Sequence, residues 1–562
     1  MKSRPGSYFL RLVLSVALLT TATIVAPPAR GWQQQQQQGA AVAPKPASTL
    51  SSAEREASAR VKLETIRSVT STLAGREMEG RGTATPGGEK AARYLAEQFS
   101  KLGLKPLGDA GTYLQAVKFK SSHMMPESFI KAGDVSLKFG QDFIVSPPYT
   151  SASADATGEL VFVGYGLTSP ELKRDDLAGL DVKGKIVVVL NGRPKNADEA
   201  AWSKATANQA VGRNLIAQGA AGIILAYAGA TERPYTVVAD YLARRRVALA
   251  DWQQPSVKLP PILIVGPEGA EKLFAGAGTT FAQAMQKAAS GEFASLALKK
   301  PATVGTRVKL EEVTGSNVVG LLEGSDPKLK DQAVVYSAHY DAFGTDSSGR
   351  IYPGAADNAL GVGMMMSIAE AFSKSTTSRP RRSIIFLAVT GEEYGLLGAQ
   401  HWVEHPTWPI ERIAADLNFD GIGTEVYGPV KRIVAFGAEY SDLGAVFEDV
   451  TAATGNIVTP DPFPEEKAFY RSDHYAFVLK GVPALMLLGA PGGDPTPFIA
   501  RAQKWMATDY HQPTDTVRPD WNWDGPRTLA MVGMIIGMRV ADANQMPAWL
   551  PAAPFKRAPG TS

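Results

Sequence analysis

The fold is decided by the stretch RSIIFLAVTGEE, residues 382–393, in which a run of mostly apolar residues ends at two adjacent glutamates. Further strands are predicted at AVVYSAHYD (333–341), AADLNFDGIG (414–423) and VPALMLLGA (482–490). Helices are predicted at about 361–374, 395–404, 441–453 and 526–542. Buried strands with helices between them predict an α/β domain, in which helices flank a central mixed, mainly parallel sheet.

Polar residues gather where these predicted strands end. They are His339, Asp341, Glu392, Glu393 and Asp420. Ligands bind beyond the carboxyl ends of the strands in such sheets. Carboxylates packed close together repel one another and resist ionisation unless a cation neutralises them. The strand ends therefore predict a metal site.

The composition restricts which metal site and which partners are possible. The 562 residues include no cysteine and six histidines, so any metal must be held by His, Asp and Glu side chains. Lys and Arg number 58 against 55 Asp and Glu, which gives a net charge of +3. This balance does not provide the basic field that nucleic-acid binders use, so no nucleic-acid partner is expected.

Each candidate residue has an ordinary structural explanation when it is taken alone. His339 is a satisfied strand-end histidine in that reading, and Asp357 is a helix N-cap. Glu392 and Glu393 are then solvated residues at a helix start, where the helix dipole favours them. Taken together, these residues are stronger evidence for a metal site than any one of them alone. His511, in the stretch DYHQPTDT, is a further member of the set.

Residues 330–520 resemble metallopeptidase family twenty-eight, the co-catalytic di-zinc aminopeptidases. Relatives in that family include bacterial leucine aminopeptidases, glutamate carboxypeptidase, glutaminyl cyclases and the transferrin receptor ectodomain. The stretches that carry the resemblance, in the family's order, are SAHYDAFG, GAADNALGVG, TGEEYGLLGA, LNFDGIG, RSDHYAF and YHQPTDT. The earlier stretch LAGREMEGRGT (73–83) looks like the family's N-terminal opening. The resemblance implies a fold of the zinc aminopeptidase/phosphorylase type.

The resemblance also implies a complete set of ligands for two Zn²⁺ ions. One zinc would be held by His339, Asp357 and Asp420, and the other by Asp357, Glu393 and His511, with Asp357 as the bridge. The peptide bond between Asp357 and Asn358 is expected to be cis, as it often is in family structures. Oxygen and nitrogen ligands suit zinc, and two such ions can act together on one carbonyl.

Other residues of the site receive roles from the same resemblance. Glu392 is the expected general base, and Tyr510 is the expected stabiliser of the oxyanion. Asp341 lies two positions after His339 on the same strand face, so it is expected to accept the hydrogen bond from the other imidazole nitrogen. Asp473 and His474 are candidates for the substrate pocket or for supporting a ligand, with a purely structural role as the alternative.

The stretch HWVEH, from His401 to His405, also matches the H-x-x-E-H pattern of inverted zinc proteases. Pro406 follows directly and disfavours the helical conformation at His405, which the pairing of the two histidines requires. The favoured interpretation is the end of an amphipathic helix.

The amino-terminal residues have the pattern of a signal peptide. Lys2, Arg4 and Arg11 precede or begin a short apolar run, Leu12–Val25. An uncleaved membrane anchor is the alternative. We expect an exported protein, periplasmic or extracellular, without a membrane partner after cleavage.

Residues 158–229 resemble a protease-associated domain. We therefore expect a discontinuous peptidase domain that carries an insert. The predicted segments are a signal peptide (1–30), a disordered Gln/Ala/Pro-rich spacer (31–50), the N-terminal part of the peptidase domain (51–138), the protease-associated insert (139–301), the catalytic part (302–545) and a disordered tail (546–562).

These observations predict a zinc aminopeptidase whose substrates are peptide or protein N-termini. A glutamate-releasing carboxypeptidase is an alternative, in which Arg471 or Arg501 would hold the substrate carboxylate. Glutaminyl cyclase activity on the same fold is another, and a binding module of the transferrin receptor type is a third. Trp505, Trp521 and Trp523 flank His511 and either line an aromatic pocket or belong to the core or surface.

Overall fold

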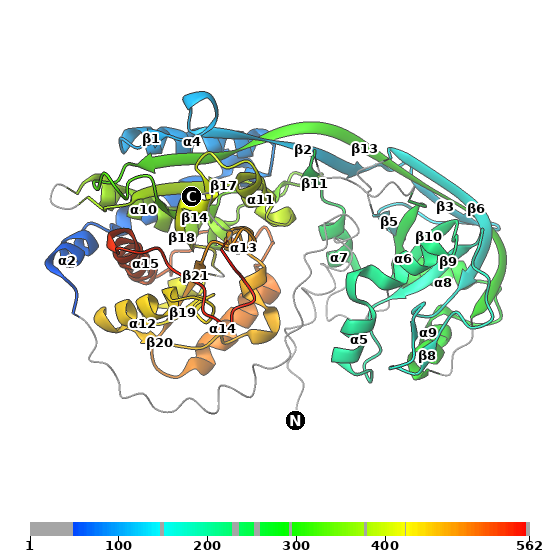
Figure 1. Cartoon of the computed structure of the whole chain (residues 1–562). Coiled ribbons are helices and arrows are strands. Elements are labelled where there is room, and N and C mark those ends of the chain that lie inside the picture. Colours follow the sequence, from blue (N-terminus) through cyan, green and yellow to red (C-terminus); the bar gives the residue numbers. More distant parts are fainter. Residues whose placement is uncertain are drawn as a thin grey trace. The chain divides into compact units, whose positions relative to one another are not determined.

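The structure of the chain is a computed structural model (Figure 1). It describes residues 49–146, 151–227, 235–251, 259–291, 295–375, 379–421 and 423–557. The predicted signal peptide (1–30) and all of the predicted spacer before residue 49 lie outside the described residues.

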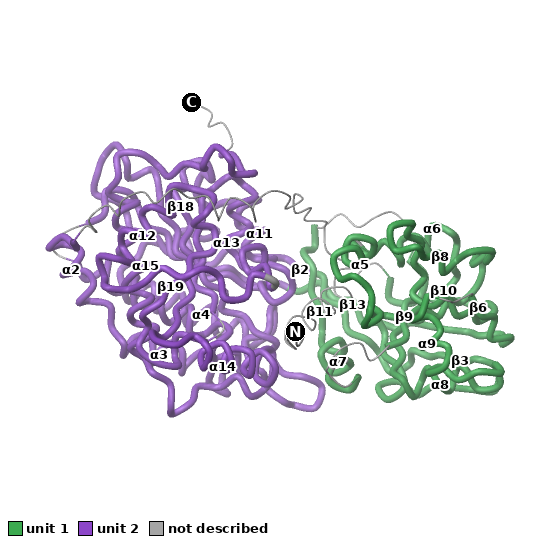
Figure 2. Tube along the Cα trace, turned by 90° about the horizontal axis from the view of Figure 1, so that it is seen from below, with its two compact units in different colours: residues 1–24, 120–313 green, residues 25–119, 314–562 purple. Residues whose placement is uncertain are grey.

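The described chain forms two compact units, shown in different colours in Figure 2. Unit 1 contains the described residues of 120–313, and unit 2 contains those of 49–119 and 314–557. The chain crosses between the units within two strands, β2 (Leu114–Met124) and β13 (Leu296–Leu322). The predicted insert, 139–301, falls inside unit 1, and its identity as a protease-associated domain stays a prediction.

Unit 2 is built on a mixed sheet whose four central strands run parallel. In spatial order its strands are β1 (Lys105–Pro106), β13, β17 (Ser383–Val389), β14 (Ala333–His339), β18 (Ile413–Asn418), β21 (Ala484–Pro491), β19 (Val430–Phe436) and β20 (Ile457–Val458). The strands β17, β14, β18 and β21 are parallel, whereas β13 and β19 pair antiparallel on either side of them. The predicted fold class is confirmed.

Helices cover both faces of this sheet (Figure 1). Alternate residues of β14 point to opposite faces. Val334 and Tyr336 belong to a core with helices α3, α10 and α15, whereas Val335 belongs to a second core with α11 and α13. Burial on both faces explains why these strands are almost continuously apolar.

The helices of unit 2 are α2 (Ser52–Ala59), α3 (Leu63–Leu73), α4 (Pro86–Lys101), α10 (Leu360–Ser373), α11 (Leu397–Glu404), α12 (Leu443–Ala453), α13 (His474–Leu479), α14 (Pro495–Thr508) and α15 (Asp524–Asp542).

The order of the central strands reverses beside β14. The chain passes from β14 through α10 to β17 on one side, and then through α11 to β18 on the other side of β14. Such a reversal leaves a crevice at the carboxyl ends of the strands, which is where open α/β sheets bind ligands. The predicted strand at 382–393 ends at Val389, so that Glu392 and Glu393 lie in the turn that follows it.

Unit 1 has a smaller mixed sheet of its own. Its strands, in spatial order, are β13, β6 (Ser153–Phe162), β9 (Ile186–Asn191), β10 (Gly222–Tyr227), β12 (Ile262–Val265) and β5 (Phe143–Val145), and β3 (Phe129–Ala132) also pairs with β13. The strands β6, β9, β10 and β12 are parallel. The helices of unit 1 are α5 (Glu199–Ala205), α6 (Ala210–Ala217), α7 (Tyr235–Leu242), α8 (Pro267–Phe274) and α9 (Phe281–Ser290).

The end of the described chain packs against unit 2. Trp549 and Phe555 contact a hydrophobic core cluster. Arg557 donates hydrogen bonds to the main-chain oxygens of Ile413, at 2.7 Å, and Ala414, at 3.0 Å. Part of the segment predicted as a tail, 546–557, is therefore ordered against the domain. Residues 558–562 lie outside the described residues.

Candidate metal centre

The strand-end residues of unit 2 meet at the carboxyl end of β14. His339 is the last residue of β14, and Asp420 follows the end of β18 by two residues. Glu393 lies in the turn after β17, and Asp357 lies in a turn directly before α10. His511 comes from the loop after α14. Five residues from five separate segments therefore converge.

His339, Asp357 and Asp420 form the first group of potential metal ligands. The Nε2 atom of His339 lies 3.2 Å from Asp357 Oδ1 and 3.3 Å from Asp420 Oδ1. One ligand atom from each residue lies within 4.8 Å of the others. His339 is fully buried, whereas 16% of the Asp420 side chain is exposed, so solvent can reach this group from one side.

Asp357, Glu393 and His511 form the second group. The Nε2 atom of His511 lies 3.0 Å from Glu393 Oε2 and 3.3 Å from Asp357 Oδ2. The ligand atoms of this group also lie within 4.8 Å of one another. The His511 side chain is 15% exposed. This group is therefore accessible as well.

Asp357 belongs to both groups, and its two carboxylate oxygens face different histidines. Oδ1 faces His339 and Oδ2 faces His511. The peptide bond between Asp357 and Asn358 is cis, which confirms that prediction. A carboxylate with one oxygen toward each group has the placement of a bridging ligand between two ions. Imidazole and carboxylate are donors that zinc accepts, so the residues of both groups suit zinc.

The electrostatics of the cluster are those of a site with excess negative charge. Burial raises the pKa of Glu393 to about 7 and that of Glu392 well above its usual range. Burial also acts to raise the pKa of Asp357, but hydrogen bonds from His339 and His511 outweigh it, and the pKa is lowered. Burial acts to lower the pKa of His339, yet Asp420 and Glu392 raise it well above its usual range. Carboxylates crowded in this way favour the binding of a cation.

Asp341 organises the turn that carries Glu392. Its Oδ1 accepts a hydrogen bond from the Glu392 main-chain N–H at 3.2 Å, and its Oδ2 accepts one from the Thr83 hydroxyl at 2.7 Å. The Nδ1 atom of His339 lies 3.2 Å from the main-chain oxygen of Asp341 and 3.7 Å from its Oδ1. The nearer acceptor for His339 is thus the main chain of Asp341, whereas its carboxylate was expected in that role.

Tyr510 and Phe343 enclose the ring of His511. The Tyr510 ring stacks on His511 with ring centroids 3.6 Å apart, and Phe343 meets the same imidazole edge to face at 4.6 Å. Burial raises the pKa of Tyr510 well above its usual range. The Nη2 atom of Arg471 lies 3.5 Å from the Tyr510 hydroxyl, and Arg471 also pairs with Glu466 at 3.1 Å. The expected role of Tyr510 at the oxyanion stays a prediction.

Asp473 and His474 are fully buried, and Asp473 interacts electrostatically with His339 and Asp420. Neither carboxylate oxygen of Asp473 has a hydrogen-bond partner in the structure. Burial raises the pKa of Asp473 well above its usual range and lowers that of His474 to about 3. Full burial does not fit the wall of an exposed substrate pocket, which was the expected role of these residues.

The other expected candidates lie outside the two ligand groups. Trp505 is buried and its ring contacts Tyr510 at a centroid distance of 5.4 Å. Trp521 and Trp523 contact each other and pack against the main core of unit 2. The guanidinium of Arg501 lies 5.9 Å from the centroid of the Tyr427 ring.

The H-x-x-E-H stretch does not form a third ligand group. His405 ends α11 with a φ of −124°, and its ring centroid lies 4.7 Å from that of His401. Glu404 forms an ion pair with Lys480 at 2.7 Å. The ligand groups found in the described part of the chain include neither histidine.

Several residues near the site were not singled out from the sequence, although they stand in the quoted stretches. Asn358 donates from Nδ2 to the Phe419 main-chain oxygen at 2.8 Å and thereby fixes the segment that precedes Asp420. Thr83, Arg81 and Asp515 contact the segments that carry the ligands. Their positions in LAGREMEGRGT and YHQPTDT were the available signal, but a role could not be assigned before these distant segments were brought together.

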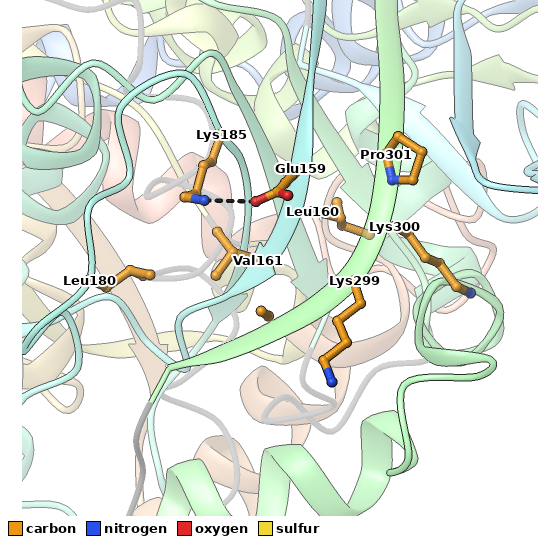
Figure 3. A pocket seen from close by; sticks show the side chains of 9 residues that line it. Glu159, Leu160, Val161, Leu180, Lys185, Lys299, Lys300 and Pro301 are labelled. Carbon is orange, nitrogen blue, oxygen red and sulfur yellow. Dashed lines mark hydrogen bonds and ion pairs between the residues drawn. The ribbon is translucent and has the colours of Figure 1, made fainter.

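A cavity of about 310 Å³ lies in unit 1, away from these residues in the sequence (Figure 3). Its lining includes Lys185, Lys299 and Lys300, and Lys185 forms an ion pair with Glu159 at 2.9 Å. Its nine lining residues include one carboxylate and no histidine. This cavity therefore lacks the ligands of a metal site.

Comparison with known proteins agrees with the geometry. Residues 317–533 match the model of the family described as peptidase family M28. This part of the chain belongs to peptidase family M28. We call residues 317–533 the M28 segment. It contains every residue of the two ligand groups.

Named relatives match short parts of the chain. A vacuolar membrane protease of Clavispora lusitaniae is 38% identical over 108 residues, which are 19% of this chain and 9% of that protein. A probable zinc metalloprotease of Pyricularia oryzae is 39% identical over 111 residues, 19% of this chain and 21% of that protein. The chain thus matches about a tenth to a fifth of the length of these relatives.

The fold extends beyond the M28 segment. The structure of an aminopeptidase from Aneurinibacillus sp. strain AM-1 matches 88% of this chain and 97% of its own length, with a TM-score of 0.55 and 19% identity. At this identity the match shows a shared fold. The α/β architecture therefore holds for nearly the whole described chain.

The relatives correct the expected location of the protein. A periplasmic or extracellular location was predicted, but several of these relatives are vacuolar membrane proteases of yeasts, which point to the vacuolar membrane. The prediction failed because an apolar leader indicates entry into a membrane system without specifying the final compartment. Within the described residues, no helix has both the length and the apolar character needed to cross a bilayer.

Proposed function

We propose that the protein is an aminopeptidase that removes N-terminal residues from peptides and that it binds two zinc ions. The observation that carries this proposal is the placement of Asp357, whose two oxygens lie 3.2 Å from His339 Nε2 and 3.3 Å from His511 Nε2. His339, Asp357 and Asp420 would hold one ion, and Asp357, Glu393 and His511 would hold the other.

The donor set suits this chemistry. Three carboxylates and two neutral imidazoles carry a charge of −3 against +4 for two zinc ions, so the loaded site keeps a positive charge. Two zinc ions would polarise the scissile carbonyl and make a water molecule more acidic. All five side chains come from different segments, whose positions are fixed by the sheet and by the contacts of Asp341 and Asn358.

Glu392 is the proposed general base. Its main-chain N–H is held by Asp341, its side chain is 12% exposed, and its Oε2 lies 3.9 Å from His339 Nε2. The carboxylate would accept a proton from the attacking water and then give it to the amine that leaves when the peptide bond breaks. Positive charge in the site would offset the burial that raises the pKa of Glu392 and so keep it ionised.

Two further observations support an aminopeptidase. The chain shares the fold of the Aneurinibacillus aminopeptidase over nearly all of that protein. The net charge of +3 offers no basic field for a nucleic-acid substrate. Tyr510 remains a candidate for stabilising the oxyanion, because its ring stacks on His511 at the edge of the second group.

The test is mass spectrometry of a defined peptide mixture after incubation with zinc-loaded protein. The mixture contains peptides with a free amine, N-acetylated counterparts and peptides that begin with Gln. Loss of single N-terminal residues from the free-amine peptides alone, abolished by a chelator, is the expected result. Trimming from the carboxyl end would replace the proposal with a carboxypeptidase, and loss of ammonia from the Gln peptides would replace it with a cyclase.

A further inference from the structure

Arg81 is a fully buried arginine in unit 2, between α3 and α4. Its guanidinium donates hydrogen bonds to four main-chain oxygens. The acceptors are Tyr340 at 2.6 Å, Leu73 at 2.7 Å, Gly354 at 2.8 Å and Pro353. Burial of a charged guanidinium costs free energy, because the group loses its hydration, unless hydrogen bonds and nearby opposite charges compensate for the loss.

Two of these acceptors belong to segments that carry potential metal ligands. Tyr340 lies between His339 and Asp341, and Gly354 lies three residues before Asp357. The main-chain oxygen of Arg81 in turn accepts a hydrogen bond from the Ala342 N–H at 3.3 Å. Arg81 therefore links the end of β14 to the turn that carries Asp357.

Asp515 holds the same turn from its other side. Its carboxylate accepts hydrogen bonds from the N–H groups of Ala356, at 3.0 Å, and Asp357, at 3.1 Å. The carbonyl groups of the turn thus bond to Arg81, and its N–H groups bond to Asp515. Gly354 fits between them because its φ is +55° and an added Cβ would lie 2.4 Å from the Asp357 main-chain oxygen.

The charge of Arg81 matches the acidic surroundings. Burial is the largest influence and lowers the pKa of Arg81 to about 10, while the carboxylates of Asp341, Asp515, Glu393 and Asp357 act to raise it. The side chain is therefore a cation at neutral pH. It supplies a fixed positive charge behind the carboxylates.

The backbone at Arg81 adds an independent observation. Glu79 and Arg81 have φ values of +50° and +48°, on either side of Gly80 at +68°. Residues other than glycine adopt this conformation at a cost, and they keep it where the surrounding structure enforces it, often at functional sites. An added Cβ at Gly80 would lie 2.4 Å from the Gly344 main-chain oxygen, so this segment is packed closely against the residues that follow β14.

We propose that Arg81 is a positioning residue of the metal centre, which acts with Asp515 to fix the segments of His339 and Asp357 before a metal ion binds. The inference rests on the proposed two-zinc site and adds a residue from outside the M28 segment to it. Contacts that orient metal ligands raise metal affinity because less order has to be created on binding.

Arg382 offers a matched control in the same unit. It is 1% exposed, and its guanidinium donates to the main-chain oxygen of Val540 at 2.9 Å and to Gln332 Oε1 at 2.8 Å. It directly precedes β17, at the amino end of the sheet, whereas the ligands lie at the carboxyl end. A strand of seven residues spans roughly 20 Å, so Arg382 is a buried, carbonyl-binding arginine remote from the site.

The experiment compares Arg81→Lys with Arg382→Lys. The zinc dissociation constants of the purified full chain are measured by competition with a chromogenic chelator, and thermal unfolding is recorded with and without zinc. Arg81→Lys is expected to weaken zinc binding by about 10- to 100-fold. Arg382→Lys is expected to keep zinc affinity within about twofold while also lowering the unfolding temperature, since both changes remove contacts to buried carbonyls.

Equal zinc affinity in wild type and Arg81→Lys would overturn the inference, and so would equal weakening by both lysine variants. Asp515→Asn provides a second test, which decides the matter if Arg81→Lys does not fold. It should weaken zinc binding as well, because an amide has one acceptor oxygen where the carboxylate has two. Failure of the wild-type protein to bind zinc would instead refute the proposed function, so the two failures are distinguishable.

Discussion

The two units contain sheets of the same kind whose strand ends carry different residues. In unit 1 the parallel strands end at Phe162, Asn191, Tyr227 and Val265. In unit 2 the strands β14, β17 and β18 end at or just before a histidine, two glutamates and an aspartate. Architecture alone therefore does not create a metal site. The side chains decide whether metal ligands are available, and both groups of potential ligands in the described residues belong to unit 2.

The largest effect is expected from Asp357→Ala. Removal of a carboxylate that faces both histidines takes one ligand from each group, so both metals and all measurable activity should be lost together. Metal content by atomic emission and turnover of a free-amine peptide check this outcome. Full activity with intact metal content would exclude Asp357 from the site.

The next effect is expected from Glu392→Gln. This variant keeps the size of the side chain but cannot accept the proton, so turnover should fall by about 10²- to 10⁴-fold. Both metals should stay bound, because Glu392 belongs to neither ligand group. Unchanged turnover would remove Glu392 from the role of base, and the metal content shows whether the site has stayed intact.

A smaller effect, of a different kind, is expected from Asp416→Asn. Asp416 is a fully buried carboxyl inside β18, and burial raises its pKa to about 8. Between its ordinary pKa and pH 8 the folded state holds a proton that the unfolded state has lost. The free energy of unfolding therefore falls as the pH rises, by up to about 1.4 kcal/mol per pH unit.

Asp416→Asn should remove this part of the pH dependence, while zinc content stays unchanged. Urea unfolding of wild type and variant between pH 5 and 8 measures the difference between their slopes. Parallel slopes would show that Asp416 does not hold the proton. Loss of zinc from Asp416→Asn would show that a carboxylate inside a strand, and not only those beyond the strand ends, contributes to metal binding.

The smallest effect is expected in unit 1. Asn191 occupies the end of β9 and is the polar residue among the four strand ends named above. Asn191→Ala should change kcat/KM and zinc content by less than about twofold, because polar surface substitutions away from special features have small effects. A large loss of activity would show that the strand ends of unit 1 also serve the reaction.

Much of the site could be predicted from the sequence because its ligands stand at strand ends or in short motifs. His339, Glu393 and Asp420 follow apolar runs that are recognisable by themselves. Asp357 was assigned as a ligand by resemblance, but the local pattern predicted an N-cap. The N-cap residue of α10 is Ala359, and Asp357 lies two residues before it with a φ of −116° and a ψ of 93°. That conformation is held by Asp515, which lies 158 residues further along the chain.

The parts that were not predicted depend on distant contacts. The strand β19, with the sequence VKRIVAF, was missed because Lys431 and Arg432 interrupt its apolar run, although its second half is buried. The role of Arg81 could not be predicted from the sequence, because its hydrogen-bond partners are main-chain carbonyl groups, which every residue has. No pattern of side chains reveals such contacts before the chain is folded.

The division of unit 2 into two stretches of sequence has a consequence for the order in which the protein is made. Unit 1 lies between these stretches and is complete at residue 313. Arg81 and His511 are 430 residues apart, which is about 20 to 90 s of synthesis at typical rates. The segment of Arg81 is synthesised long before Tyr340 and Gly354, whose main-chain oxygens accept its hydrogen bonds in the folded protein. Of the two units, the one that holds the first described residues is thus the later to close, and both histidines of the centre are present only after residue 511 has been made.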